Sequence, residues 1–394
     1  MNKKSVKDVD LKGKRVLMRV DFNVPLDADC NITDDNRIRA ALDTIRYVIA
    51  EGGKLILMSH LGRPKGEKVS KMSLKPVAVR LSQLLGKPVK MLDDCIGEKV
   101  KKEVDALKPG EVVLLENLRF YKQETKNDPE FSRKLSELGD VFVNDAFGAA
   151  HRAHASTEGV TKYLESVSGF LVQKEIEYFQ KVLISADRPF LFILGGAKVS
   201  DKIPVIENML NKADAIIIGG AMAYTFMKVK GIDIGSSRKE EDMYDTVKKI
   251  LEKAGEKGVK VLLPLDHVVT DNIETSANVK ITEAQTIDNG WMGVDIGPKT
   301  IELFSGQIKK AKTIVMNGPM GIFENNKFAK GTRAVEDAVA DSGAVSVIGG
   351  GDTAASVAQF NLSDKMSHIS TGGGASLEYL EGKVLPGIAA LADK

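Results

Sequence analysis

Residues 344–358 read AVSVIGGGDTAASVA: an apolar run ends at three glycines, and small residues that suit a helix follow. This pattern predicts a buried strand that leads through a Gly-rich turn into a helix N-terminus. Glycines let the backbone approach an oxyanion closely, and the first amides of a helix point at such a ligand. Asp352 could hold a metal ion that bridges phosphates, and Thr353 could donate to them. The segment therefore indicates a site for nucleotide phosphates.

The same alternation of apolar runs and helical stretches continues along the whole chain. The runs lie at 15–24, 54–62, 88–92, 112–120, 140–148, 190–196, 215–220, 260–269, 313–319, 344–350 and 368–374. Near-continuous apolar strands separated by helices favour parallel sheets that are covered on both faces. These strands are too many for one comfortable open sheet, so the sequence predicts two α/β domains.

A long helix over residues 169–185, GFLVQKEIEYFQKVLIS, is the expected boundary between the domains. Leu171, Ile176, Phe179 and Leu183 recur at roughly helical spacing. Arg188-Pro189 then breaks the pattern before the next strand.

Composition narrows the class of protein. The chain has 394 residues, 43% of them apolar and 28% charged, with a formal net charge of +2 and no long basic block, so we expect no nucleic-acid partner. There is no apolar run long enough for a membrane span, and the first residues, MNKKSVKDVDLKGK, lack the apolar core of a signal peptide. Cys30 and Cys95 have no metal-binding spacing and fit a reducing compartment. We expect a cytoplasmic protein.

Ligands of open parallel sheets bind outside the carboxyl ends of the strands, so the residues that follow each run are the candidates for a site. In the first half these are Asp21, Asn23, His60, Arg63, Glu116, Asn117, Arg119, Asn144 and Asp145, with Arg37, His151, Arg152 and His154 nearby. Most of them bind anions or hydroxyl groups. Any one arginine could instead lie on the surface, Asp21 and Asn23 could cap a turn, and His60 could be packed in the core. Several arginines at strand ends together favour a binding site for an anion.

The second half offers glycine and lysine instead. Its runs are followed by Gly195-Gly196-Ala197-Lys198, Gly219-Gly220, Asp266-His267, Asn317-Gly318-Pro319, Gly350-Gly351-Asp352-Thr353 and Gly372-Gly373-Gly374. Any single pair of glycines could be a tight turn. Their recurrence with lysine and one aspartate suits a polyphosphate with a divalent cation.

Two local motifs resemble other nucleotide sites but lack the right context. The stretch GGGDTA at 349–354 satisfies the dinucleotide fingerprint, although it stands near the end of the chain and does not open a mononucleotide-binding unit. The stretch GGAKVSDK at 195–202 lacks the spacing of a P-loop, and the H-R-D and D-F-G motifs of protein kinases are absent.

Blocks spread over the whole chain resemble the phosphoglycerate kinase family. They read RVDFNVP (19–25), SHLGRPKG (59–66), ENLRF (116–120), VNDAFGAAHRAHAS (143–156), GGAKVSDKI (195–203), NGPMGIFE (317–324), GGGDTAA (349–355) and STGGGASLE (370–378). The resemblance implies two doubly wound, Rossmann-like parallel-sheet lobes joined by a helix hinge. The N-terminal lobe would be residues 1–168, the linking helix 169–186 and the C-terminal lobe 187–377, with 378–394 returning to the N-terminal lobe.

The resemblance also implies a ligand for each lobe. The contacts to 3-phosphoglycerate or 1,3-bisphosphoglycerate would be Asp21, Asn23, Arg37, His60, Arg63, Arg119 and Arg152. Those to magnesium with ADP or ATP would be Gly196, Lys198, Lys202, Gly220, Asn317, Glu324, Gly350, Gly351, Asp352 and Thr353. Asp352 would serve the Mg²⁺ and Glu324 the ribose. Family members are usually monomeric. Departures such as Asp43 and Ala149 are expected to affect only helix entry or local packing.

The implied reaction moves a phosphoryl group between an acyl phosphate and ADP. The carboxylate acceptor of the reverse direction is already ionised near neutral pH, so no general base is needed. Arg37, Lys198 and the amides of Gly351 and Gly373 would offset the charge of the transferring group. We also expect closure about the 169–185 helix, which would align the ligands and exclude water.

Three alternatives differ in class. A kinase for a smaller carboxylic acid would not need the arginine set of the first half. An NAD-dependent dehydrogenase is supported only by residues 349–354. A non-catalytic binder of phosphoglycerate or nucleotide would have little use for both residue sets together.

Overall fold

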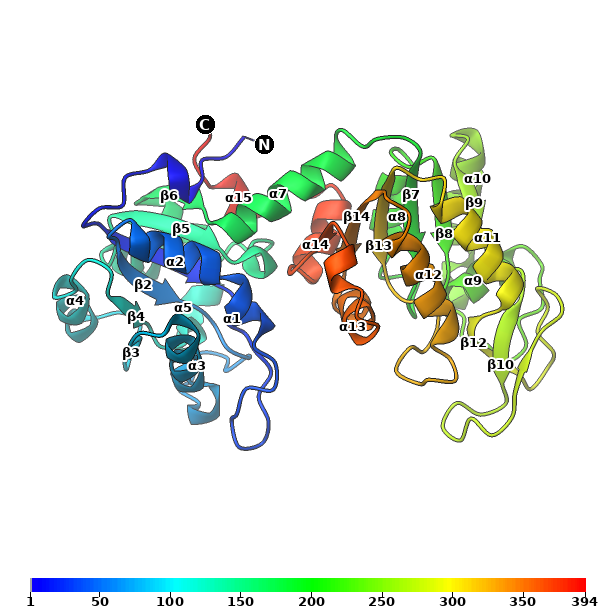
Figure 1. Cartoon of the computed structure of the whole chain (residues 1–394), viewed down its shortest axis with the longest axis horizontal. Helices are drawn as coiled ribbons and strands as arrows, with labels where there is room; N and C mark the ends of the chain where they lie inside the picture. The colour runs from blue at the N-terminus through cyan, green and yellow to red at the C-terminus, as the bar shows by residue number, and fades with distance from the viewer. Residues whose placement is uncertain (1) are drawn as a thin grey trace. The chain divides into compact units, whose positions relative to one another are not determined.

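The computed structural model describes residues 2–394 and divides them into two compact units. The first unit runs to Glu177 and includes Val384–Lys394, and the second is Tyr178–Lys383. The division falls within helix α7 (Phe170–Leu183), drawn in green in Figure 1. The predicted long helix at 169–185 is therefore present.

A parallel sheet with strand order β3-β4-β2-β1-β5-β6 forms the centre of the first unit. Its strands are β1 (Arg15–Val20), β2 (Lys54–Met58), β3 (Lys90–Met91), β4 (Val112–Leu114), β5 (Val141–Asp145) and β6 (Glu165–Ser168). The five predicted strands are present. The sixth, β6, reads ESVS and was not predicted, because its polar side chains gave no apolar run.

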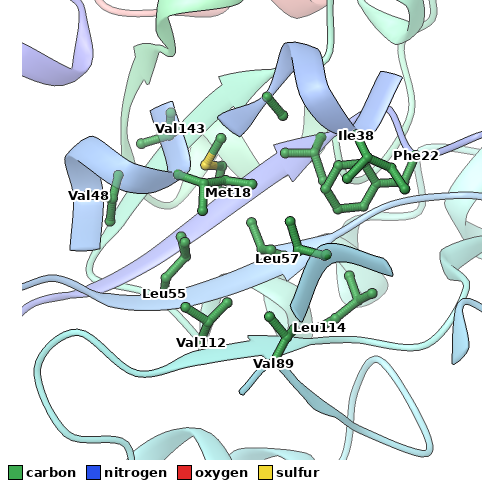
Figure 2. Packing of buried hydrophobic residues seen from close by; sticks show 14 of the residues in the cluster. Met18, Phe22, Ile38, Val48, Leu55, Leu57, Val89, Val112, Leu114 and Val143 are labelled. Carbon is green, nitrogen blue, oxygen red and sulfur yellow. The ribbon is translucent and has the colours of Figure 1, made fainter. Parts of the chain in front are cut away.

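Helices pack around this sheet (Figure 1). They are α1 (Asn36–Ala40), α2 (Leu42–Ala50), α3 (Lys75–Leu85), α4 (Glu98–Asp105), α5 (Lys122–Thr125), α6 (Pro129–Ser136) and α15 (Pro386–Ala389), with short 3-10 helices η1 (Val6–Asp8), η2 (Ser70–Met72), η3 (Leu118–Phe120), η4 (Phe147–Ala149) and η5 (Gly159–Lys162). Figure 2 shows Met18 and Leu57 of neighbouring strands packed with Ile38 and Phe22. Because apolar side chains such as these fill the faces of the sheet, the ends of the strands are left for polar side chains.

The second unit repeats the plan with strand order β15-β14-β13-β7-β8-β9, again parallel. The strands are β7 (Phe190–Leu194), β8 (Ala215–Ile218), β9 (Lys260–Leu262), β13 (Thr313–Asn317), β14 (Val345–Gly349) and β15 (His368–Ile369). The helices are α8 (Ile203–Met209), α9 (Met222–Val229), α10 (Tyr244–Glu256), α11 (Pro298–Ile308), α12 (Lys330–Ala340), α13 (Gly351–Gln359) and α14 (Gly374–Leu380), with η6 (Glu241–Met243) and η7 (Ser363–Lys365). The predicted fold class, α/β with two parallel sheets flanked by helices, is confirmed.

A small antiparallel sheet corrects one predicted strand. Residues 260–269 do not form one strand: β9 ends at Leu262, and β10 (His267–Thr270) pairs with β11 (Val279–Ile281) and β12 (Met292–Ile296). Pro264 has no N–H to continue the ladder. The carboxylate of Asp266 accepts the N–H groups of Lys299 at 3.0 Å and Thr300 at 2.8 Å, at the start of α11. Asp266 is therefore a helix cap and His267 begins another sheet.

No helix among residues 2–394 combines the length and the apolar character that crossing a bilayer requires. Both cysteines are free thiols; Cys95 is buried and Cys30 is partly exposed.

Candidate functional site

The first polar group after β1 is Asp21, and it is paired with an arginine from another element. Nη1 of Arg37, on α1, lies 2.8 Å from Oδ2 of Asp21. Oδ1 of Asn23 accepts the N–H of Gly62 at 2.8 Å, which ties the end of β1 to the loop after β2. The N–H of Asn23 also faces Oδ1 of Asp21 at 3.3 Å, so the expected turn contact exists beside the ion pair.

His60 is a buried histidine surrounded by arginines. Its Nδ1 lies 3.0 Å from Nη2 of Arg19. Burial, followed by the charges of Arg19, Arg119, Arg152 and Arg37, holds the pKa of His60 well below its usual range. Because the influence of a charge falls off with distance, His60 marks the place where arginines from separate elements of the first unit converge.

Arg119 is buried and fixed by the backbone around it. Asn117 caps the N-terminus of η3, where its Oδ1 accepts the N–H of Arg119 at 3.0 Å, and Nη1 of Arg119 donates to the carbonyl of Gly62 at 2.8 Å. Burial and the charges of Arg152 and Arg19 lower the pKa of Arg119 to about 10. Its buried Nε has no hydrogen-bond partner among residues 2–394. A buried, unpaired donor that is repelled by neighbouring cations is stabilised by a bound anion.

Three of the predicted arginines line one open cavity of about 390 Å³ in the first unit. The lining residues are Arg63, Lys65, Gly66, Arg119, Tyr121, Lys122, Thr125, Lys126, Arg152 and His154. No carboxylate is among them, so the wall presents positive charge and neutral groups. Such a wall favours a small anion with more than one negative charge.

One buried carboxylate, Glu124, lies near this cavity without lining it. Its Oε2 accepts the N–H of Ser156 at 3.0 Å and its Oε1 accepts the Ser156 hydroxyl at 2.6 Å. Burial raises the pKa of Glu124, and the charge of Arg19 opposes that effect. Nδ1 of His154 lies 3.7 Å from Glu124, and burial, with the nearby arginines, lowers the pKa of His154 to about 3. His154 is therefore neutral near pH 7.

In the second unit, the loops after β7, β8 and β13 pack backbone against backbone. A Cβ on Gly195 would lie 2.0 Å from the carbonyl oxygen of Pro319, and one on Gly220 would lie 2.4 Å from the nitrogen of Gly196. Gly220 and Gly196 also have positive φ values of 63° and 101°. A Cβ on Gly196 would meet nothing within 4 Å. Gly195 and Gly220 are thus required for loop packing, whereas Gly196, whose N–H and carbonyl are hydrogen-bonded to Pro319 and Met222, leaves only the space of its missing side chain free for a ligand.

A second cavity, of about 430 Å³, lies beside these loops. Its lining residues are Gly196, Ala197, Gly220, Ala221, Tyr224, Ser236, Arg238, Ile273, Met292, Gly293, Val294, Pro319, Met320, Gly321, Ile322, Phe323, Glu324 and Asp352. Apolar and glycine walls with a few polar groups are typical of a small-molecule site.

The segment 344–358 folds as predicted into β14, a turn and α13. Gly350 precedes the helix with φ 90°, and a Cβ on Gly351 would meet nothing within 4 Å. The hydroxyl of Thr353 is buried and accepts the N–H of Gly318 at 2.7 Å, so this side chain also holds the neighbouring loop. The first amides of α13 remain available to an anion.

Lys202 and Asn317 form a pair beside this turn. Nζ of Lys202 donates to Oδ1 of Asn317, and burial lowers the pKa of Lys202. Nδ2 of Asn317 is buried and has no partner among residues 2–394, and a Cβ on Gly350 would lie 3.0 Å from it. The turn thus has an unused donor that a phosphate oxygen could accept from.

Asp352 fits a magnesium ion that is shared with a nucleotide. Its side chain is exposed in the first turn of α13. Nowhere in residues 2–394 do three or more His, Cys, Asp or Glu side chains gather as metal ligands. Mg²⁺ is commonly held by one or two carboxylates together with substrate phosphates and water, so a lone aspartate is compatible with this ion.

The predicted residues Lys202, Asn317, Gly350, Gly351 and Thr353 are not among the lining residues of the second cavity, and neither are Lys198 and Gly373. Lys198 is exposed and forms no ion pair within the described chain. Gly373 precedes α14 with φ 50°, and a Cβ on it would meet nothing within 4 Å.

Several residues at the two cavities, and one beside His60, were not predicted. Arg19, which contacts His60 and lines neither cavity, lies inside the otherwise apolar strand β1, and its charge within this buried run is the one sequence signal that could have indicated it. Lys65, Lys122 and Arg238 lie in loops or short helices away from the strand ends. A rule based on strand ends alone therefore misses them.

Known proteins resemble nearly the whole chain, and not only the two cavities. The family model described as phosphoglycerate kinase matches residues 6–383. The chain belongs to the phosphoglycerate kinase family. Phosphoglycerate kinases of Chloroherpeton thalassium and Clostridium tetani are 58% and 57% identical to it over 397 and 396 residues, which is 100% of this chain and 100% and 98% of theirs.

Solved structures agree with this assignment. The phosphoglycerate kinase of Coxiella burnetii superposes with a TM-score of 0.91 at 41% identity, and that of Pyrococcus horikoshii with 0.81 at 36%. Each comparison covers 98% of both chains. The chain is thus a phosphotransferase by family, and the glycolytic reaction of phosphoglycerate kinases is its function. The resemblance found in the sequence is confirmed, and a dehydrogenase has no support.

Proposed function

We propose that the first unit binds the phosphoglycerate, that the second binds magnesium with ADP or ATP, and that a phosphoryl group passes reversibly between 1,3-bisphosphoglycerate and ADP. The observation that carries this assignment is the contrast between the two cavities. The first is lined by arginine and lysine without a carboxylate, and the second by glycine and apolar residues with Asp352 and Glu324.

The phosphoglycerate site uses the convergent arginines. Arg63, Arg119 and Arg152 bind the anionic groups, and Nε of Arg119 gains the partner that it lacks in the free chain. Neutral His60, Asn23 and the Asp21–Arg37 pair orient the rest of the ligand. His60 can donate from Nε2 because its Nδ1 faces the donor-only guanidinium of Arg19.

The nucleotide site combines an open backbone with charged groups. The part of the cavity wall formed by Gly196 and Gly220 takes the base, and Glu324 takes the ribose. The amides of Gly350 and Gly351, with Lys202, Asn317 and Thr353, receive the phosphates. Asp352 holds the Mg²⁺, which when bound supplies positive charge to the phosphate oxygens.

Transfer itself depends on alignment and on neutralised charge. The acceptor of the reverse reaction is a carboxylate with an ordinary pKa of about 4, so it is ready to attack at neutral pH. Arg37, Lys198 and the amides of Gly351 and Gly373 stabilise the charge that spreads over the transferring group. Loss of one such donor lowers turnover by roughly a hundredfold or more.

The two ligands must meet for transfer, and water must be excluded from the acyl phosphate. We therefore propose bending at the 169–186 helix between lobes 1–168 and 187–377, with 378–394 returning to the first lobe. X-ray scattering curves that are identical with and without both substrates would contradict this motion. The enzyme works as a monomer in the cytoplasm.

A direct assay tests the proposed activity. The protein is incubated with 3-phosphoglycerate and ATP, and hydroxylamine traps the acyl phosphate as a hydroxamate. We expect product with Mg²⁺ and none with EDTA, and little product from Arg37→Ala or Asp352→Asn. Lys310→Ala, an exposed lysine after α11, is the control and keeps full activity. Equal activity with acetate in place of 3-phosphoglycerate would favour a kinase for a smaller acid instead.

A further inference from the structure

Among residues 2–394, Arg238 is the one cationic residue that lines the second cavity. Its side chain is exposed and forms no hydrogen bond or ion pair with any of residues 2–394. The nearby carboxylates have other partners: Glu241 forms an ion pair with Lys239 at 2.9 Å, and Glu240 accepts hydrogen bonds from the loop after β7. The guanidinium of Arg238 is therefore free for a ligand of the cavity.

The backbone before Arg238 is tied to the apolar wall. The N–H of Ser236 donates to the carbonyl of Trp291 at 2.8 Å, and Oγ of Ser237 accepts the N–H of Gly293 at 2.9 Å. Gly293 belongs to β12, which contributes to the lining of the cavity. The backbone of Arg238 therefore lies beside the part of the cavity wall that β12 forms.

The backbone after Arg238 is tied as well. The carboxylate of Glu240 accepts the N–H of Val199, the N–H of Ser200 at 3.2 Å and the hydroxyl of Ser200 at 2.7 Å. The N–H of Glu240 also donates to Oγ1 of Thr225 at 3.2 Å, on α9. With both flanks fixed, the fold sets the position of the Arg238 backbone at the cavity.

The chemistry of the cavity assigns a partner to this cation. Asp352 marks the phosphate end of the cavity, whereas Tyr224, Met292 and Val294 form an apolar wall that suits a purine. Resting on the nucleotide site proposed above, we propose that Arg238 recognises the acceptor edge of the purine and lets the enzyme use guanine nucleotides. Arginine only donates; guanine offers two acceptors, N7 and O6, whereas adenine offers N7 beside the N6 donor.

The test compares KM for MgATP and MgGTP in the wild type, Arg238→Leu and Arg238→Gln. Arg238→Leu raises KM for GTP by roughly tenfold, the effect of one lost bidentate contact, and changes KM for ATP by less than about twofold. Arg238→Gln shifts the preference further toward ATP, because a carboxamide matches N6 and N7 of adenine. Lys239→Leu removes the same charge one residue away, outside the cavity lining, and leaves the GTP/ATP ratio unchanged.

Equal increases in KM for both nucleotides, or no change in either, would overturn the proposal. Asp352→Asn separates this failure from failure of the nucleotide site itself. If Asp352→Asn raises KM for both nucleotides while Arg238→Leu leaves their ratio unchanged, only the role of Arg238 is wrong. If Asp352→Asn also changes nothing, the nucleotide lies elsewhere and both proposals fall.

Discussion

Nη2 of Arg19 lies 3.0 Å from Nδ1 of His60, and both side chains are buried. Since a guanidinium only donates, Nδ1 must accept and the proton of the neutral ring sits on Nε2. Burial and the arginines hold the pKa of His60 well below 6.5. A folded-state pKa below the unfolded value means that stability from this group is present above pH 6.5 and is lost as pH falls.

We therefore predict that His60 keeps its neutral, Nε2-protonated form from pH 8 down to pH 5.5. Nitrogen-15 NMR of the histidine rings measures this directly, with His60→Gln used to assign the signal. A midpoint near pH 6.5 for His60 would contradict the role given to Arg19.

Arg119 gives a prediction for the anion site. Replacing Arg119 with Gln removes a charged donor from the first cavity, so KM for 3-phosphoglycerate should rise about 10- to 100-fold. KM for ATP should stay within about twofold. Arg46→Gln is the matched control, because Arg46 is an exposed arginine on α2 that lines neither cavity. A parallel loss of affinity for ATP would indicate general unfolding instead.

Asp145 predicts how stability depends on pH. It is buried at the start of α7, where its Oδ1 accepts the N–H of Leu171 at 2.9 Å, and burial raises its pKa to about 7. Because the pKa of Asp145 is higher in the folded than in the unfolded chain, this group stabilises the folded state. The stabilisation is complete below pH 3.8, the unfolded pKa, and is lost as pH rises through about 7, the folded pKa. Asp145→Asn keeps the acceptor without the charge. From pH 5.5 to 8 the wild type should lose about 2 kcal/mol relative to the variant, measured by urea unfolding. Parallel pH profiles of the two proteins would refute this assignment.

How much of this could be predicted from the sequence depends on the residue. Apolar runs predicted every strand of the second parallel sheet and all but β6 of the first. The prediction of a single strand over residues 260–269 was wrong because β9 and β10 are both apolar in sequence. Only Pro264 and the helix-capping Asp266 separate them. The strand-end rule identified Arg119 and Asp352, since parallel strands deliver their ends to one edge. It missed Arg19 and Arg238, whose roles depend on tertiary contacts.

The glycines of the second unit should differ in their tolerance of substitution. Gly220→Ala places a Cβ 2.4 Å from the nitrogen of Gly196 and strains a positive φ, so it should destabilise the second unit by about 2–4 kcal/mol and raise KM for ATP. Gly231→Ala is the control, with φ 79° but nothing within 4 Å of the added Cβ, and should cost about 1 kcal/mol. Urea unfolding compares them; equal effects would mean that the loop contact at Gly220 contributes little.

The central claim is that one unit binds the phosphoglycerate and the other the nucleotide. Isothermal titration of 3-phosphoglycerate and of MgADP, each into Arg63→Met and Lys202→Met, tests it most directly. Arg63→Met should weaken 3-phosphoglycerate at least about tenfold and leave MgADP unchanged, and Lys202→Met should do the reverse. Loss of both ligands on either substitution, or of the opposite ligand, would contradict the account.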